Sequence, residues 1–400
     1  MYKRIVLFAM CLSIASAENP LSFTEAFKLR LEVDNDISAM VQLQAASELD
    51  VDLVGALSNT EFESVLENFG HDEIELGVMQ VFEVPSIRKS RRLLAESELG
   101  GLDVELEYLK VQIHHDLSMY FLKAARLDQE LRLSRNRLEM SKRILNWQEH
   151  QHNEGALSES ELIRTRYEIA ELDSEVKRLE LSQRHLADEL GIYLGKEVSA
   201  EDLVIGFPGF PDSELITRTW DQLDTSPAIK QQLAQLSVLK ATIQTTKTPL
   251  ISSVGVSAGM KMLPELNQRF PIVGFSIETP LFSKRSKAVE QSEYRLRSGM
   301  EKLESINANM EISSKHWLNE WNISSHQLNS IQQVLIPEAE RLYGRIEDEY
   351  RAGARQYLEV LNTQAILTDL QQKELELHSE MAALLFEMNL TLGVTIYEFN

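Results

Sequence analysis

The sequence has little cysteine, glycine or proline, and no long apolar run after its beginning. Its 400 residues include one cysteine, Cys11, together with 17 glycines and 10 prolines. One cysteine excludes an internal disulfide and a zinc site built from several cysteines. Scarce glycine and proline leave few positions for turns, so we expect long uninterrupted elements. No apolar run of about 18 or more residues follows the first twenty positions, which excludes a membrane-spanning helix there.

The first residues have the pattern of a secretory leader. Lys3 and Arg4 precede an apolar stretch that ends in small residues. We predict a signal peptide over 1–17 that is cleaved before Glu18. Cys11 lies inside this leader, and its neighbours do not suit a lipoprotein attachment site. The mature chain is therefore expected to be free of thiols, and any membrane insertion must use strands.

Charge and motifs exclude several classes of function. The formal charge of −22 argues against nucleic-acid binding, which needs a basic surface. The sequence has no Ser-His-acid order, phosphate-binding glycine loop or helical His-Glu-x-x-His motif, so we expect neither an enzyme nor a cofactor. The pairs His114-His115 and His150/His152 are candidates for metal ligands. Helix neighbours one or two positions apart do not face each other, so we predict no metal site.

The chain is internally duplicated. Gly155 and Gly353 stand 198 positions apart (353 − 155), and Gly195 and Gly393 have the same offset (393 − 195). About forty residues therefore run in register between the two halves, which indicates a repeat of one structural unit. The two predicted repeats are 18–205 and 206–400.

Each repeat is expected to contain a helix, two strands, a long helix, a glycine turn and a returning helix. Alternating apolar residues indicate the strands, and heptad-like apolar spacing indicates the long and returning helices. In the first repeat these are a helix from Ser22 to about Ala46, strands near 49–57 and 75–84, and then 86–153, Gly155 and 158–193. In the second repeat they are a helix from Asp212 to about Thr246, strands near 251–262 and 271–278, and then 285–352, Gly353 and 356–392.

The predicted lengths imply an elongated molecule that assembles. A helix of about 70 residues spans about 100 Å, which no compact domain of this size can bury. Each returning helix has half that length. We expect the opening helix of the opposite repeat to lie end to end with it, so that one long rod pairs with two half rods. Four strands cannot close a membrane barrel, which needs about eight. Three chains would supply twelve strands and two would supply eight, and the sequence leaves both open.

Two segments carry a family resemblance. The first runs from Leu335-Ile336-Pro337-Glu338 through Gly353 to Val360-Leu361, and the second is the strand-to-helix junction at 80–89. Over nearly its whole mature length the chain resembles the TolC family of outer-membrane efflux factors, in particular the heavy-metal, CzcC-like branch. That branch usually has a glycine after the junction proline, where this chain has Ser86.

The resemblance implies an α+β membrane channel in the outer membrane of a Gram-negative cell. It would be a homotrimer in which each chain gives four strands to a twelve-stranded β-barrel in outer-membrane lipid, continued by an α-helical barrel in the periplasm. The implied partners are a periplasmic adaptor and an inner-membrane pump of the resistance-nodulation-division type. The implied role is passive export of metal cations. Drug efflux and type I protein secretion use the same fold and remain alternatives, as does a non-channel periplasmic coiled-coil protein.

The resemblance also places a selectivity ring at the periplasmic entrance. The family has acidic residues on the returning helix just after the second turn, and here those positions hold Glu359 and Asn362. Glu161 is in register with Glu359, and Glu159 lies beside the first turn. A ring of negative charges around a constriction attracts cations and repels anions. The alternative is that these are ordinary solvated helix residues.

The two turns are the predicted docking surface for the adaptor. An exposed turn with a small apolar surface is what a partner hairpin can cover, although a plain helix turn would have the same sequence. The residues concerned are Gly155, Ala156, Leu157, Gly353, Ala354 and Arg355.

Overall fold

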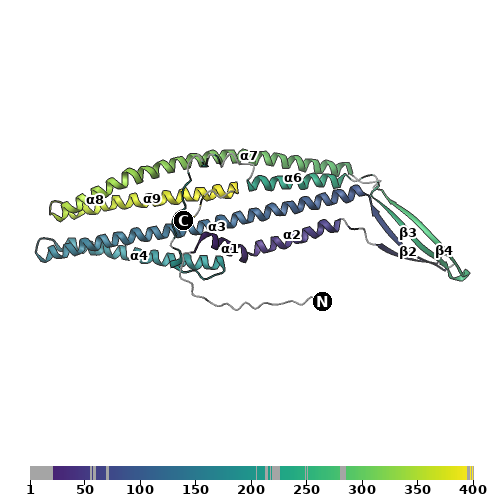
Figure 1. Cartoon of the computed structure of the whole chain (residues 1–400), viewed down its shortest axis with the longest axis horizontal. Coiled ribbons are helices and arrows are strands. Elements are labelled where there is room, and N and C mark those ends of the chain that lie inside the picture. Colours follow the sequence, from purple (N-terminus) through teal and green to yellow (C-terminus); the bar gives the residue numbers. More distant parts are fainter. Residues whose placement is uncertain are drawn as a thin grey trace.

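The structure is a computed structural model of the whole chain, and it shows an elongated molecule with helices along most of its length and a sheet at one end (Figure 1). The residues that the structure describes are 21–54, 56, 60–68, 72–203, 205–211, 215–216, 218, 226–247, 249, 251–279, 285–393, 397 and 399. The predicted leader, Cys11 and most of the predicted helix start between 212 and 225 lie outside them.

The described residues of the first repeat include four α-helices and two strands. Ser22 caps the first helix, because its Oγ accepts a hydrogen bond from the backbone N–H of Glu25 at 3.3 Å. Pro85 begins the long helix at a position where its missing N–H costs nothing. The elements are α1 (Phe23–Val33), α2 (Asn35–Val54), β1 (Thr60–Asn68), β2 (Asp72–Glu83), α3 (Pro85–Asn153) and α4 (Glu159–Leu194).

In the second repeat the long helix is interrupted. A π-helical segment, η4 (Ile331–Leu335), lies between α7 (Arg285–Ser330) and α8 (Ile336–Arg351). Pro337 follows at once and has no N–H for a helical bond, which is a usual cause of such an irregularity. The other elements of this repeat are α6 (Pro227–Thr246), β3 (Ser253–Leu263), η3 (Pro264–Leu266), β4 (Gln268–Glu278) and α9 (Tyr357–Leu392), while the short 3-10 helix η1 (Ala200–Leu203) lies at the end of the first repeat.

Two sequence predictions near the N-terminus are wrong. The strand predicted over 49–57 is helix as far as Val54, and the strand pairing with β2 is β1 instead. The predicted single helix from Ser22 is broken at Asp34, whose backbone is extended (φ −71°, ψ 119°). Its carboxylate accepts a hydrogen bond from the N–H of Ile37 at 2.8 Å, so this residue caps the start of α2.

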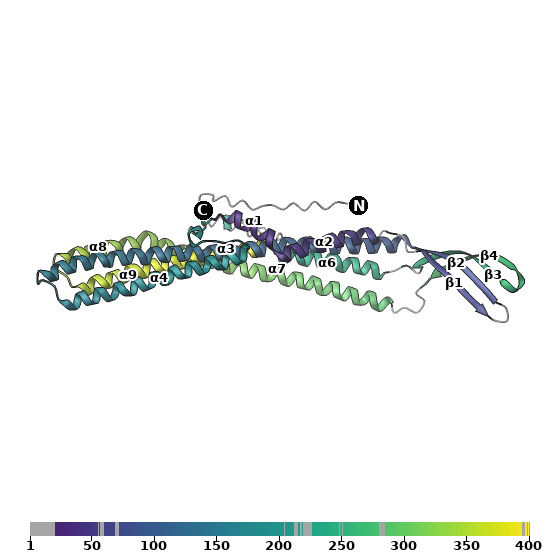
Figure 2. The ribbon, with the colours of Figure 1, turned by 90° about the horizontal axis from the view of Figure 1, so that it is seen from below.

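Each long helix does pair with two shorter sets of helices placed end to end. Both of these come from the same repeat as the long helix. In the second repeat α6 lies end to end with α9, and α7 runs beside both (Figure 1). In the first repeat α1 contacts α4 and leads into α2, with α3 alongside (Figure 2). The prediction that the opening helix comes from the opposite repeat is therefore wrong. The segment between Gly195 and Pro227 carries the chain from the first set of rods to the second, which makes this arrangement possible.

The four strands form one antiparallel sheet in the order β1-β2-β3-β4. Its register places Phe82, Val254 and Ile277 in one row across three strands, and Val78, Ala258 and Val273 in another. These rows make one face apolar. The opposite face carries glycine, serine and charged residues, including Gly255 and Ser276 in one row. β1 and β4 are the outer strands, and among the residues described here each has a strand neighbour on one side only.

An aromatic cluster holds the two described ends of the chain at the middle of the rods. The ring of Phe23 lies 5.1 Å from Phe121 of α3 and 4.9 Å from Phe399, measured between centroids. Phe386 of α9 lies 5.6 Å from Phe399, so both repeats contribute. Within the described part of the chain, no helix is both long enough and apolar enough to cross a membrane.

Gly191 provides a stability test of the junction between the repeats. A Cβ at this position would lie 2.9 Å from the backbone oxygen of Lys196, so the linker after α4 would have to move. We expect Gly191→Ala to destabilise the protein by about 1–3 kcal/mol, as overpacking against backbone does. The thermal unfolding midpoint measures this loss.

Gly101 is the matched control, because it lies within α3 and a Cβ there meets no atom within 4 Å. Gly101→Ala is expected to raise stability by roughly 0.5–1 kcal/mol through helix propensity. Equal thermal unfolding midpoints for the two variants would contradict the close packing of Gly191 against the backbone of Lys196.

Candidate functional site

The two helical turns at the end opposite the sheet have the same backbone geometry (Figure 1). Gly155 and Gly353 have φ values of +75° and +78°, in the left-handed region that glycine adopts without strain. The N–H of Ala156 bonds to the carbonyl of Gln151 at 3.0 Å, and the N–H of Ala354 bonds to that of Glu349 at 2.8 Å. Both turns are Schellman motifs, which explains the glycine at each.

The proposed docking residues lie at these turns and are mostly exposed. Gly155, Ala156, Gly353, Ala354 and Arg355 are exposed, and Leu157 is half-buried. His152 fixes the first turn through its Nδ1, which lies 2.8 Å from the carbonyl oxygen of Leu157. Adaptor docking here stays a prediction.

Tyrosines beside the second turn join the two repeats. Gln148 of α3 donates a hydrogen bond to Tyr350 Oη of α8 at 2.9 Å, and Tyr350 donates in turn to Glu161 of α4 at 3.5 Å. Tyr357 of α9 donates to Glu168 of α4 at 3.0 Å. Burial raises the pKa of Tyr350 to about 12, so its hydroxyl stays protonated and can donate. The role of these tyrosines was not predicted from the sequence, where they only form part of the segment that carries the family resemblance.

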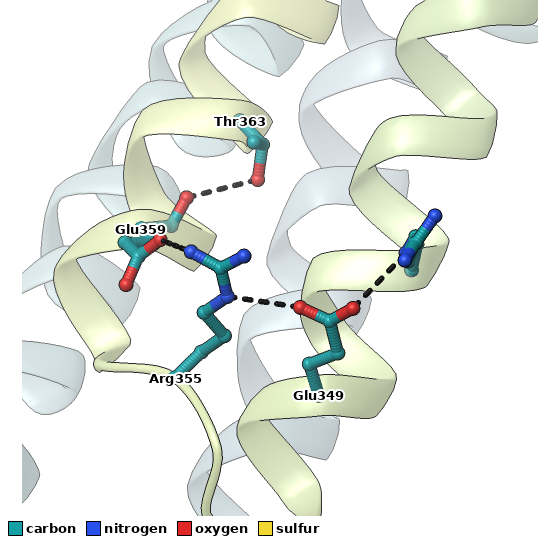
Figure 3. A network of polar contacts seen from close by, with 5 residues as sticks. Glu349, Arg355, Glu359 and Thr363 are labelled. Atoms are coloured by element: carbon teal, nitrogen blue, oxygen red, sulfur yellow. Dashed lines mark hydrogen bonds and ion pairs between the residues drawn. The ribbon is translucent and has the colours of Figure 1, made fainter.

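An arginine lies between two glutamates at the second turn (Figure 3). Arg355 donates from Nε to Glu349 at 2.9 Å and from Nη1 to Glu359 at 2.7 Å. Arg345 also donates to Glu349, at 3.0 Å. Hydrogen bonds from the two arginines hold the pKa of Glu349 below its usual range. Thr363 donates to the carbonyl of Glu359 and holds the first turn of α9.

Two of the residues predicted for a selectivity ring have different partners within one chain. Glu359 is half-exposed and is paired with Arg355, while Glu161 accepts from Tyr350. Asn362 and Glu159 are exposed. A ring would require the same residues from further copies of the chain, and it stays a prediction.

The histidines considered as metal ligands have other contacts. His114 packs edge-on against Phe23 and Phe27, at centroid distances of 4.8 and 5.3 Å. Its burial lowers its pKa to about 4. His115 Nδ1 lies 3.2 Å from a backbone carbonyl, and His150 Nε2 lies 3.4 Å from Glu154. Among the residues that the structure describes, no group of three or more His, Cys, Asp and Glu side chains could hold a metal ion.

Known proteins resemble this chain in sequence and in structure, although no protein-family model matches it. The cobalt-zinc-cadmium resistance protein CzcC of Cupriavidus metallidurans is 20% identical over 369 residues, which cover 88% of this chain and 85% of CzcC. The outer membrane protein VceC from Vibrio cholerae superposes with a TM-score of 0.73 at 14% identity, over 93% of this chain and 96% of VceC. CusC superposes with a TM-score of 0.72 at 14% identity, over 92% of this chain and 91% of CusC. Its crystal structures concern conformational changes that accompany folding and transmembrane channel formation.

The chain has the fold of the TolC family of outer-membrane channels. The resemblance inferred from the segments around Gly353 and around 80–89 is thereby confirmed. The superpositions cover 93% and 92% of this chain, and the uncovered part is too small to contain all four strands. Both the rods and the sheet therefore belong to the TolC fold. In this fold the Schellman turns at Gly155 and Gly353 are the free end of the helical part, opposite the sheet (Figure 2).

Tyr350 gives a direct test of the bond between repeats at this end. Tyr350→Phe removes a hydroxyl that contacts both Gln148 and Glu161, and it leaves the buried amide of Gln148 without its acceptor. We expect the variant to lose about 1–3 kcal/mol of stability in this region. The loss is measured as faster amide hydrogen exchange across 345–362.

The matched control is Tyr167→Phe. Tyr167 also donates to a glutamate, Glu171 at 2.6 Å, but on the exposed surface of α4. This variant is expected to exchange like the wild type. If Tyr350→Phe also left exchange unchanged, the bond would not join the repeats in solution.

Proposed function

We propose that this chain is the outer-membrane channel subunit of a tripartite efflux pump and that it forms the channel as a homotrimer. The observation that carries the proposal is that the four-stranded sheet is open at both edges. It has one apolar face, one polar face and two outer strands, β1 and β4, and within the described part of the chain neither of these has a second strand neighbour. A sheet in lipid must close so that every backbone polar group is satisfied, and three copies in a ring would give twelve strands.

The helical part supports the same assembly. Contacts place the helices in the order α4-α3-α9-α8 near the turns and α2-α3-α6-α7 near the strands. One edge of the wall is therefore formed by the first repeat and the other by the second. Large apolar side chains are exposed on both edges, such as Leu181 on α4, Leu53 on α2 and Ile312 on α7. A neighbouring copy would cover these side chains as the wall closes.

The proposed channel is a passive conduit that depends on partners for energy. An inner-membrane pump, of the resistance-nodulation-division type, would supply the energy, and a periplasmic adaptor would cover the turns at Gly155 and Gly353. The exposed backbone and small side chains of these turns suit contact with a helical hairpin. The proposed location is the outer membrane, with the rods in the periplasm.

We propose metal cations as the cargo. This rests on the likeness to CzcC, which is named for cobalt, zinc and cadmium resistance, and on a formal charge of −22 that suits passage of cations. Drug efflux and type I secretion are the other cargoes that this fold accommodates.

Planar-bilayer recording on the purified full-length chain tests the channel itself. We expect discrete single-channel currents from a trimer, and we expect them to be small because the proposed entrance is narrow. A protein that stays in the soluble periplasmic fraction and gives no current would instead support the alternative of a structural coiled-coil protein.

Charge reversal at the second turn tests the selectivity ring. Glu359→Lys is expected to lower the permeability of K⁺ relative to Cl⁻, because each chain replaces a negative charge with a positive one. Arg355→Ala is expected to raise it, on the order of a few-fold, because it frees the carboxylate of Glu359 from its partner. Reversal potentials in a salt gradient measure both effects.

Arg345→Ala is the control for these variants, since Arg345 is more exposed than Arg355 and its ion pair is with Glu349 and not with Glu359, as far as the described residues show. It should leave selectivity near the wild-type value. Unchanged reversal potentials for both Glu359→Lys and Arg355→Ala would show that these residues are ordinary solvated helix residues.

A deletion strain tests the cargo. We expect loss of the gene to lower tolerance to zinc, cobalt or cadmium, and the wild-type gene to restore it. Unchanged metal tolerance together with increased drug sensitivity would favour drug efflux and leave the channel proposal intact.

A further inference from the structure

His378 of α9 lies where that helix meets the π-helical segment η4. Its Nε2 is 3.0 Å from Nε2 of Gln332, which belongs to η4. The same amide nitrogen donates a hydrogen bond to Glu374 of α9 at 2.8 Å. One side chain of the π-helical segment is thus tied to α9 at two points.

These contacts fix the protonation state of the imidazole. A carboxylate accepts hydrogen bonds only, so Gln332 must direct its NH₂ group towards Glu374. That group has no acceptor atom, and its second hydrogen points to His378. His378 Nε2 must therefore accept, which requires a neutral ring with its hydrogen on Nδ1. Nδ1 is buried and has no hydrogen-bond partner within the described part of the chain.

The ring also packs against the linker between the repeats. Its centroid lies 5.4 Å from that of Phe207 and 5.3 Å from that of Phe210. Burial lowers the pKa of His378, and Glu374 acts in the opposite direction. Glu374 is the charged group that faces the ring from α9, while Gln332 of η4 and the two phenylalanines of the linker are uncharged.

The position of η4 gives this contact its importance. It interrupts the long helix of the second repeat, whereas α3 runs through the corresponding region of the first repeat as one α-helix. π-helical turns are points where a helix can change its direction. α8 continues from η4 to the turn at Gly353, so a contact that holds η4 also sets how α8 lies against α9.

We propose that His378 is a proton-operated latch that holds the π-helical segment η4 against α9 when neutral and releases it when protonated. A proton from solvent on Nε2 converts that atom from an acceptor into a donor, which cannot face the NH₂ group of Gln332. The imidazolium then turns to Glu374, whose carboxylate is 3.9 Å away, and displaces Gln332. Acidification loosens η4 and with it the hairpin of α8 and α9, whatever the chain exports.

Amide hydrogen exchange on the purified full-length chain tests the latch. Rates are compared at pH 7.5 and 5.5 after correction for the intrinsic pH dependence of exchange. We expect protection across 331–336 to fall roughly fivefold at the lower pH, the size of one lost hydrogen bond. Protection across 133–138 of α3, the corresponding stretch of the first repeat, is expected to stay constant.

His378→Gln keeps an acceptor for Gln332 but cannot take up a proton. Its protection across 331–336 should be the same at both pH values. His326→Gln, at an exposed histidine of α7, is the matched control and should respond like the wild type. A fall that persists in His378→Gln, or no fall in the wild type, would overturn the latch.

Glu374→Gln provides a second test if His378→Gln does not fold. Removing this carboxylate takes away the interaction that raises the pKa of His378. The loss of protection should therefore shift to lower pH. A transition that stays at the wild-type pH would also overturn the proposal. Because the readout is hydrogen exchange, its outcome is independent of conductance and cargo.

Discussion

The unpaired outer edges of β1 and β4 are the constraint on which the rest of the architecture depends. Each edge carries backbone N–H and C=O groups, and every such group left unsatisfied in lipid costs several kcal/mol. The helical wall is open at the same two places. β1 follows α2 along the chain, and β4 precedes α7, so each sheet edge continues into a helical edge of the same repeat. A single rotation that brings one copy beside the next can therefore close sheet and wall together.

The sequence predicts the long elements well because their signals are local. Heptad spacing over tens of residues has no competing interpretation, and a glycine in the left-handed region explains each turn. The first strand was misplaced because the alternation at 49–57 also fits a helix, where Leu49 and Leu53 lie on one face. β1 is absent from the sequence prediction because Glu61 and Glu63 make this segment polar. In a strand with one polar face, that alternation of glutamates is the signal.

Contacts between the repeats could not be predicted from either repeat alone. A duplication implies two equivalent tips, yet the position that holds Tyr350 in the second repeat holds His152 in the first (350 − 198). His152 bonds within its own turn, whereas Tyr350 reaches Gln148 and Glu161 of the other repeat. The backbone of the turn is shared because glycine geometry sets it. The side chains that join the repeats depend on how the two hairpins pack, and no pattern within one hairpin contains that information.

Charge is distributed differently at the two ends of the molecule. At the second turn two arginines, Arg345 and Arg355, pair with Glu349 and Glu359, so the charges of this group balance. The polar face of the sheet is not balanced in this way. Among the residues on this face away from the helices are Glu61, Glu63, Glu73, Glu75 and Lys261. In the proposed barrel this face would line the lumen and make it negative near the sheet. Repetition of the chain by symmetry multiplies that difference, because every copy adds its charges to the same lumen.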